Sequence, residues 1–311
     1  MVEFSFPEGR STRAAVLGIG VFDGVHLGHR RIIAELCKMG RECDAEPVAV
    51  TFFPHPRAIL CPASPPRLLL PPEERLRRLH AAGAKRVAVI DFSSAAAATP
   101  PEIFLDELLN SLGTVRGVCV GEHWRFGLEG KGDTAFLARE MARRGIRFEA
   151  VPEVRIGGDI VSSSGIRDAT AAGELAEATN MLGALPCLYG EVEAGSGVAG
   201  TQLHAPTANL KVEFGVLPPD GVYATRCEVE GGSFAAVTNI GFSPTFGGTA
   251  ERRVESHLIG FSGDIYRKKL TVKLVSRLRG EKKFTAVADL EKQIREDREK
   301  ALELLSREAE K

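Results

Sequence analysis

A glycine-rich turn between a buried strand and an amphipathic helix constrains the fold of this chain more than any other segment. The apolar run Ala14–Ile19 predicts a strand buried on both faces of a parallel sheet. Residues 27–39 place apolar and charged side chains on opposite faces of a helix, and Gly40 supplies a stop. A strand, a glycine-rich turn and a helix in this order predict a doubly wound α/β domain.

Two histidines, His26 and His29, lie where this helix begins. A helix N-terminus presents backbone N–H groups without intrahelical partners, and its positive dipole end attracts anions. Histidines at positions i and i+3 are neighbours on a helix surface and can donate to phosphate oxygens. We therefore predict a polyphosphate site here. Surface histidines and zinc ligands are weaker alternatives, because no cysteine or acidic partner with zinc-finger spacing accompanies the pair.

The N-terminal half alternates short apolar runs with amphipathic segments, as in a doubly wound parallel sheet. Further strands are predicted at residues 48–53, 86–92, 115–120 and 146–151, and helices at 73–82, 101–112 and 134–144. The proline-rich segment 61–72 predicts a loop, and residues 93–99 predict either a loop or a short helix. Ligands of such sheets bind beyond the carboxyl ends of the strands, where the histidine turn is expected.

The pattern changes to period two after an alanine-rich helical stretch at residues 168–183. We place a domain boundary near Leu185, giving domains 1–184 and 185–311. Strands are predicted at residues 188–193, 222–229, 234–240, 253–259 and 270–278. They predict a small antiparallel Greek-key β-barrel. A long C-terminal helix follows, with one apolar face that we expect to pack across the barrel.

The 311 residues allow two domains, and the content of 44% hydrophobic and 26% charged residues is ordinary for a globular protein. A net charge of −1 provides no general attraction for nucleic acid. Six scattered cysteines without a Cys-x-x-Cys pair argue against a disulfide framework and a cysteine metal site. Because no secretory signal or membrane-length apolar run is visible, we expect a cytoplasmic protein without membrane partners.

Five motifs occur in a characteristic order. They are Gly20–His29 (GVFDGVHLGH), Thr51–Pro56 (TFFPHP), Arg125–Gly127 (RFG), Ser162–Arg167 (SSSGIR) and Pro206–Asn209 (PTAN). The series resembles the bacterial bifunctional riboflavin kinase and FAD synthetase family over nearly the whole chain. The resemblance implies phosphorylation of riboflavin to FMN by the C-terminal domain and adenylylation of FMN to FAD by a nucleotidylyltransferase-like N-terminal domain. The resemblance implies ATP, riboflavin and FMN as substrates and Mg²⁺ as cofactor. It does not indicate the oligomeric state.

The resemblance also assigns residues to the adenylylation. It implies that His26, His29 and Arg167 are catalytic. Residues implied to bind ATP or phosphate are Gly20, Phe22, Asp23, Gly24, Ser163 and Ser164. Taken alone, the Ser162–Arg167 motif is more often a plain helix N-cap, and its match to the family's motif reverses that preference. Asp23 has two candidate roles, a ribose or metal contact and a turn-stabilising carboxylate.

For the kinase reaction the resemblance implies that Thr207 and Asn209 bind Mg²⁺ and the ATP phosphates. Their hard oxygen donors suit Mg²⁺. Glu255 matches the glutamate that acts as general base on the ribityl hydroxyl of riboflavin, and is therefore the predicted catalytic residue of this half. Without that context Glu255 is a solvated strand residue.

Some positions depart from the family's pattern. His123 stands where relatives carry Asp or Asn, so we leave it outside the catalytic set, and Trp124 either packs in the core or stacks on a substrate ring. Thr201 and His204 replace an arginine and a glycine, and Arg267 replaces a glycine. These changes leave two alternatives open: an FMN adenylyltransferase with an impaired kinase domain, or a flavin-binding module without catalysis.

Overall fold

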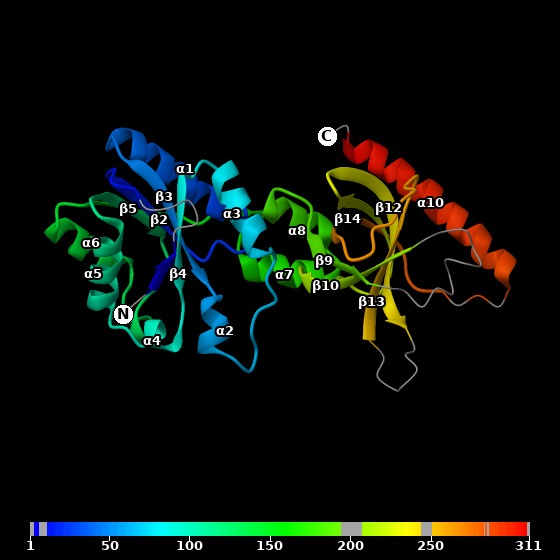
Figure 1. The fold of residues 1–311 in the computed structure, drawn as a ribbon, viewed down its shortest axis with the longest axis horizontal. Coiled ribbons are helices and arrows are strands. Elements are labelled where there is room, and N and C mark those ends of the chain that lie inside the picture. Colours follow the sequence, from blue (N-terminus) through cyan, green and yellow to red (C-terminus); the bar gives the residue numbers. More distant parts are fainter. Residues whose placement is uncertain are drawn as a thin grey trace. The chain divides into compact units, whose positions relative to one another are not determined.

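The computed structural model describes residues 3–5, 11–193, 207–243, 251–282, 284 and 286–309. The chain forms two compact units, one of residues 1–66 with 72–162 and the other of residues 67–71 with 163–311 (Figure 1). The boundary near Leu185 stays a prediction about the functional domains. Each unit is considered by itself below.

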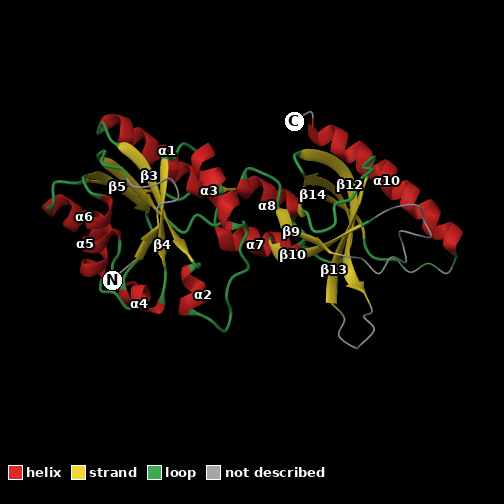
Figure 2. Ribbon diagram, in the orientation of Figure 1, coloured by secondary structure: helices red, strands yellow, loops and turns green. Residues whose placement is uncertain are grey.

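The first unit is built on a six-stranded sheet of order β1-β4-β3-β2-β5-β6 (Figure 2). The five parallel strands are β2 (Ala15–Ile19), β3 (Glu46–Phe53), β4 (Arg86–Asp91), β5 (Val115–Gly121) and β6 (Arg147–Val151). Each predicted strand of this half is confirmed. The edge strand β1 (Glu3–Ser5) is antiparallel to β4, and β7 (Arg155–Ile156) and β8 (Asp159–Ile160) form a separate hairpin. These three strands were not predicted.

Helices cover both faces of the sheet, which confirms the doubly wound class. They are α1 (Leu27–Glu42), α2 (Pro56–Leu60), α3 (Pro72–Ala81), α4 (Ser94–Ala97), α5 (Pro101–Leu112), the 3-10 turn η1 (Leu128–Gly130) and α6 (Thr134–Arg143). On one face, Leu17 joins a core with Leu105 of α5 and Leu137 of α6. On the other, a Cβ at Gly18 would lie 3.0 Å from a methyl group of Leu36, so glycine allows α1 to pack closely on β2.

The strand order places the expected ligand crevice at β2 and β5. The chain moves outward from β2 to β3 and β4, then returns to β5 on the other side of β2. In open α/β sheets, ligands bind beyond the carboxyl ends of the strands where this reversal occurs. The histidine turn follows β2, and Glu122 and His123 follow β5.

The second unit contains a closed antiparallel barrel of order β10-β13-β12-β11-β14-β9. Its strands are β9 (Cys187–Glu193), β10 (Ala208–Phe214), β11 (Gly221–Val229), β12 (Gly232–Ser243), β13 (Glu251–Leu258) and β14 (Lys269–Arg279). Successive hairpins join β11, β12 and β13, and β14 lies beside β11, which is the predicted Greek key. Five of the six strands were predicted; β10 was not.

Within the described residues, this unit also contains the helices α7 (Ser163–Ala172), α8 (Leu175–Leu182) and α10 (Val287–Ala309). Ala301 and Leu305 of α10 pack with Val222, Ala224 and Leu278 of the barrel. The predicted packing of the C-terminal helix on the barrel is therefore confirmed.

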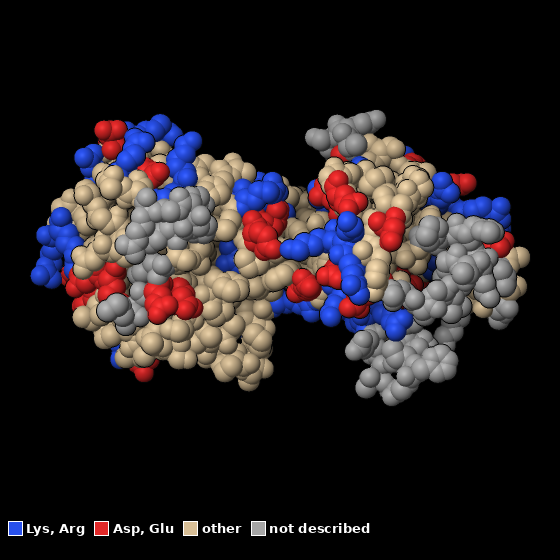
Figure 3. Space-filling model, viewed as in Figure 1, with Lys and Arg blue, Asp and Glu red and all other residues tan. Residues whose placement is uncertain are grey.

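Charged side chains of both signs adjoin one another on both units in the view of Figure 3. The six cysteines are free thiols. Among the helices of the described ranges, none is both long and apolar enough to cross a membrane.

An ion pair anchors α10 to the barrel. Nη2 of Arg279 lies 2.8 Å from Oδ2 of Asp297, and Nε lies 3.0 Å from the same oxygen. The Asp297 side chain is 7% exposed. We expect Asp297→Ala to lower the free energy of unfolding by about 2 kcal/mol, less than for a fully buried pair because Arg279 is 23% exposed. Denaturant unfolding followed by circular dichroism measures this change.

Glu303→Ala provides the control, since Glu303 pairs with Arg307 on the exposed surface of the same helix. Its expected effect is below about 0.5 kcal/mol. Equal losses in the two variants would contradict the anchoring role of Asp297.

Candidate functional site

The structure brings the two predicted catalytic histidines of the first unit into direct contact. His26 is the N-cap of α1, and its Nδ1 accepts a hydrogen bond from the backbone N–H of His29 at 3.3 Å. The two imidazole rings stack with their centroids 3.6 Å apart. Gly28 leaves room for this arrangement, because a Cβ there would lie 3.1 Å from the His26 ring. The pair therefore stands at the open N-terminus of a sixteen-residue helix.

The residues before the histidines form an unusual backbone turn. Phe22 and Val25 have φ angles of 54° and 47°, in the left-handed region that non-glycine residues rarely adopt. Gly24, with φ of 90°, also needs positive φ. Phe22 and Asp23 are fully buried, and the Phe22 ring meets the His29 ring edge-on at 5.2 Å. Gly20 joins the turn to β3 through a hydrogen bond to Val50.

Two side chains from outside this turn hold it in place. The carbonyl oxygen of Val21 accepts from Oγ1 of Thr51 at 2.9 Å and from Nη1 of Arg75 at 3.3 Å. Thr51 belongs to β3 and Arg75 to α3. Strained backbone at ligand sites persists only where surrounding structure fixes it. Thr51 was part of a quoted motif, but neither its anchoring role nor that of Arg75 was predicted.

The electrostatics of the turn favour a neutral imidazole at His29. Burial lowers the pKa of His29 well below its ordinary value of 6.5, and the neighbouring His26 and Arg75 lower it further. Nδ1 of His29 is buried without a hydrogen-bond partner. A neutral imidazole carries one donor and one acceptor nitrogen. At neutral pH His29 can thus offer a phosphate oxygen one N–H donor without carrying a full charge.

Ser163, Ser164 and Arg167 belong to the second unit, in the first two turns of α7. Nε of Arg167 donates to the backbone carbonyl of Arg67 at 2.7 Å. The role of these residues in nucleotide binding stays a prediction.

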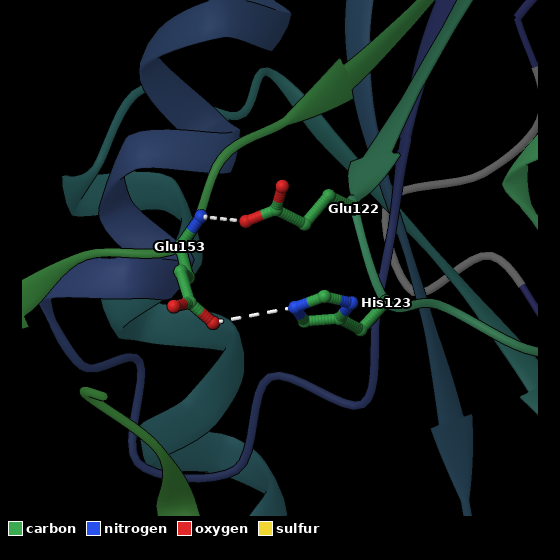
Figure 4. A group of neighbouring side chains, drawn as sticks. All are labelled: Glu122, His123 and Glu153. Atoms are coloured by element: carbon green, nitrogen blue, oxygen red, sulfur yellow. Dashed lines mark hydrogen bonds and ion pairs between the residues drawn. The ribbon is translucent and has the colours of Figure 1, made fainter. Parts of the chain in front are cut away.

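Glu122, His123 and Glu153 form a cluster beyond the ends of β5 and β6 (Figure 4). Each offers one metal-ligand atom, and these atoms lie within 4.8 Å of one another. Oε1 of Glu122 accepts from the backbone N–H of Glu153 at 2.7 Å, and Nε2 of His123 lies 3.3 Å from Oε2 of Glu153. Arg155 also pairs with Glu153. Because that cation already balances the charge of Glu153 and the His123 side chain is 77% exposed, we assign no metal to the cluster.

Trp124, which follows the cluster, packs toward the core of the sheet. Its ring stacks on Phe126 with centroids 4.6 Å apart and an interplanar angle of 13°. Phe126 is itself packed between Phe104 and Phe136. One face of the tryptophan ring is therefore covered by the protein, in agreement with the packing alternative.

The barrel aligns the predicted kinase residues by strand register. Asn209 of β10 lies directly opposite Glu255 of β13, and Glu255 also lies opposite Asn239 of β12. Side chains at such paired positions lie on one face of a sheet, with Cβ atoms about 5 Å apart. The adjacent positions 208, 254 and 256 are buried in the barrel, so this row faces outward. Thr207 immediately precedes β10.

Three residues of this unit differ from the family's pattern, and the structure describes one of them. Thr201 and His204 lie outside the described residues. Arg267 has a φ of 60°, the left-handed conformation that glycine adopts without strain. Its N–H donates to Val192 at 2.9 Å, and its guanidinium lies 5.3 Å from the centroid of the Tyr266 ring. The chain thus reaches the expected backbone state without glycine, at a cost of about 1 kcal/mol.

An α/β unit with this histidine turn and a closed β-barrel unit with this Asn209–Glu255 pair are the parts expected of a two-unit enzyme that transfers phosphate-containing groups. The FAD synthetase family model matches residues 9–165, and the riboflavin kinase family model matches residues 182–305. The chain belongs to the family of bifunctional riboflavin kinase/FMN adenylyltransferases.

Relatives cover almost all of the chain. The bifunctional riboflavin kinase/FMN adenylyltransferase of Pseudomonas fluorescens is 34% identical over 287 residues, spanning 92% of this chain and 91% of that protein. That of Bacillus subtilis (strain 168) is 30% identical over 300 residues, spanning 94% and 93%. A crystal structure described as a macrolide-efflux protein from Streptococcus pneumoniae is also similar, with a TM-score of 0.83, 28% identity and coverage of 94% and 95%.

The lowered pKa of His29 generates a prediction about pH. As the pH falls below 6.5, the unfolded chain binds a proton at His29 before the folded chain does. The stability contributed by neutral His29 is therefore complete above about pH 6.5 and declines as the pH falls toward the folded-state pKa. An NMR titration of the imidazole should find His29 neutral at pH 6.5. Half-protonation of His29 at that pH would contradict the structure, and His29→Gln should reduce the acid-induced loss of stability.

Proposed function

We propose that this chain makes FAD from riboflavin in two steps, one in each unit. The barrel unit transfers the γ-phosphate of ATP to riboflavin, giving FMN and ADP. The α/β unit transfers the adenylyl group of ATP to FMN, giving FAD and pyrophosphate. The observation that carries the proposal is the match of both family models in one chain. The stacked histidines and the pairing of Asn209 with Glu255 support it.

In the adenylylation, a phosphate oxygen of FMN attacks the α-phosphorus of ATP, and the bond to the leaving pyrophosphate breaks. Such reactions depend on positioning and on stabilisation of charge at the phosphate oxygens. We assign the N–H groups of His26 and His29, with the N-terminus of α1, to that role. The resemblance assigns Arg167, Ser163 and Ser164 to the same reaction.

In the phosphorylation, Glu255 accepts the proton of the ribityl hydroxyl as its oxygen attacks the γ-phosphorus of ATP. The hydroxyl of Thr207 and the side-chain carbonyl of Asn209 would hold Mg²⁺ and the ATP phosphates. Oxygen donors beside a carboxylate fit the preference of Mg²⁺. When bound there, the ion would neutralise charge at the phosphates. From the net charge of −1 and the absence of a long apolar run in the sequence, we also infer a cytoplasmic enzyme with small-molecule partners.

Separate substrates test this assignment. Purified protein with ATP and Mg²⁺ should convert riboflavin into FMN and FAD, and should convert supplied FMN into FAD. Chromatography with flavin fluorescence measures both products. If the protein converts supplied FMN into FAD but forms no FMN from riboflavin, the result would favour the adenylyltransferase alternative. A folded sample that forms neither product would overturn the proposal.

Single substitutions should separate the two steps. His29→Ala removes a phosphate donor and should lower the rate of FAD formation from FMN by about 100-fold, with FMN formation retained. Glu255→Ala removes the base and should lower FMN formation by about 100-fold or more, with FAD formation retained. Initial rates with each substrate measure both activities.

The exposed Glu291 of α10 offers a matched control for Glu255, and Glu291→Ala should leave both rates unchanged. Loss of both activities in either folded site variant would contradict the division between the units.

A further inference from the structure

Arg75 is a buried cation beside the histidine turn. The residue is 2% exposed, and its Nη1 donates to the carbonyl oxygens of Val21 at 3.3 Å and Phe52 at 3.2 Å. Its Nε and Nη2 atoms are buried and have no hydrogen-bond partner. Since a guanidinium carries five N–H donors, the Nε–H and both Nη2–H groups are unused.

The two anchoring carbonyls fix where the guanidinium lies. Val21 begins the turn that leads to the histidines, and Phe52 lies near the carboxyl end of β3. Arg75 acts electrostatically on His29, and Asp23 acts on Arg75. The cation therefore lies beside the histidine turn, at the carboxyl end of β3.

Unused donors on a buried charge require an explanation. Burial of an ionised group without full hydrogen bonding is strongly unfavourable. Burial indeed lowers the pKa of Arg75, and Asp23 opposes that shift. Asp23 balances the charge at a distance, but no hydrogen bond from Arg75 to it accounts for the unused N–H groups. An anionic acceptor in the crevice would satisfy them.

We propose that Arg75 binds a phosphate group of the substrates held at the histidine turn, through the edge of the guanidinium formed by Nε and Nη2. This edge presents parallel donors that match two oxygens of one phosphate. Nη1, fixed to two backbone carbonyls, holds that edge in place before the substrate arrives. The inference rests on the proposed adenylylation and adds a substrate-binding residue to it.

The same helix supplies a matched control. Arg77 lies two residues further along α3, its side chain is 67% exposed, and its Nε pairs with Glu74 at 2.6 Å. Arg77→Met removes the same charge from the same helix without touching the turn. It should therefore leave substrate affinities unchanged.

The test compares Arg75→Met, Arg75→Lys and Arg77→Met in the full chain. Pyrophosphate binding is measured by calorimetry, and KM values for ATP and FMN are measured during FAD formation. Loss of charge-assisted hydrogen bonds should weaken pyrophosphate binding or raise one KM by about 10- to 100-fold in Arg75→Met. Arg75→Lys keeps the charge but not the paired donors, so its effect should be smaller. A rise in KM for ATP or for FMN identifies whose phosphate Arg75 contacts.

If Arg75 only holds the turn in place and binds no substrate, the variants should give a different result. Folded Arg75→Met protein with lowered thermal stability but unchanged KM values and pyrophosphate affinity would overturn the inference. If that variant fails to fold, unchanged KM values in Arg75→Lys would overturn it. Circular dichroism and thermal unfolding report the integrity of the α/β unit in each sample. Wild-type protein that makes no FAD would refute the proposed adenylylation, whereas the effect of the variants on pyrophosphate binding would still test Arg75.

Discussion

The carbonyl oxygen of Val21 is the point on which the histidine turn, residues 20–29, depends. It accepts hydrogen bonds from Thr51 and Arg75, which belong to different elements of the sheet and its covering helices. The turn that follows places Phe22 and Val25 in left-handed conformations, each costing about 1 kcal/mol. These contacts stabilise that backbone, and the backbone places His26 at the helix cap. The donors are thus oriented before any charge develops, as electrostatic stabilisation requires.

In the barrel, strand register and not a strained turn aligns the predicted kinase residues. A row of buried hydroxyls crosses its interior: Thr225 lies 2.7 Å from Thr238, and Thr238 lies 2.9 Å from Ser256. The outward pair of Asn239 and Glu255 occupies the neighbouring rung of the same ladder. A one-residue slip would turn the hydroxyls outward and break this row. The interior hydrogen bonds therefore help to fix the position of Glu255.

Hydrophobic patterning predicted the continuous apolar runs of the parallel strands and most of the alternating barrel strands, but it missed β10 and α2. The parallel strands could be predicted because burial of both their faces produces continuous apolar runs in the sequence. Strand β10 alternates as clearly, yet its first residues belong to the PTAN motif and were interpreted only as ligands. Helix α2 is short and has no buried residue, so it has no apolar face to detect. Arg75 could not be distinguished from Arg77 or Arg78, because burial of one arginine depends on tertiary packing.

Two of the departures from the family's pattern, Arg267 and His123, make local contacts that the structure describes. Arg267 adopts the conformation that a glycine would adopt, and a backbone hydrogen bond and the Tyr266 ring accompany it. Asn209 and Glu255 keep their pairing on the outer face of the barrel, which depends on the ladder and not on residue 267. His123 points to Glu153 at the edge of the first unit, whereas His26 and His29 contact each other through a separate turn. A change at one of these positions therefore alters a local contact, while the elements that position the catalytic candidates are held by sheet register and by the two hydrogen bonds to Val21.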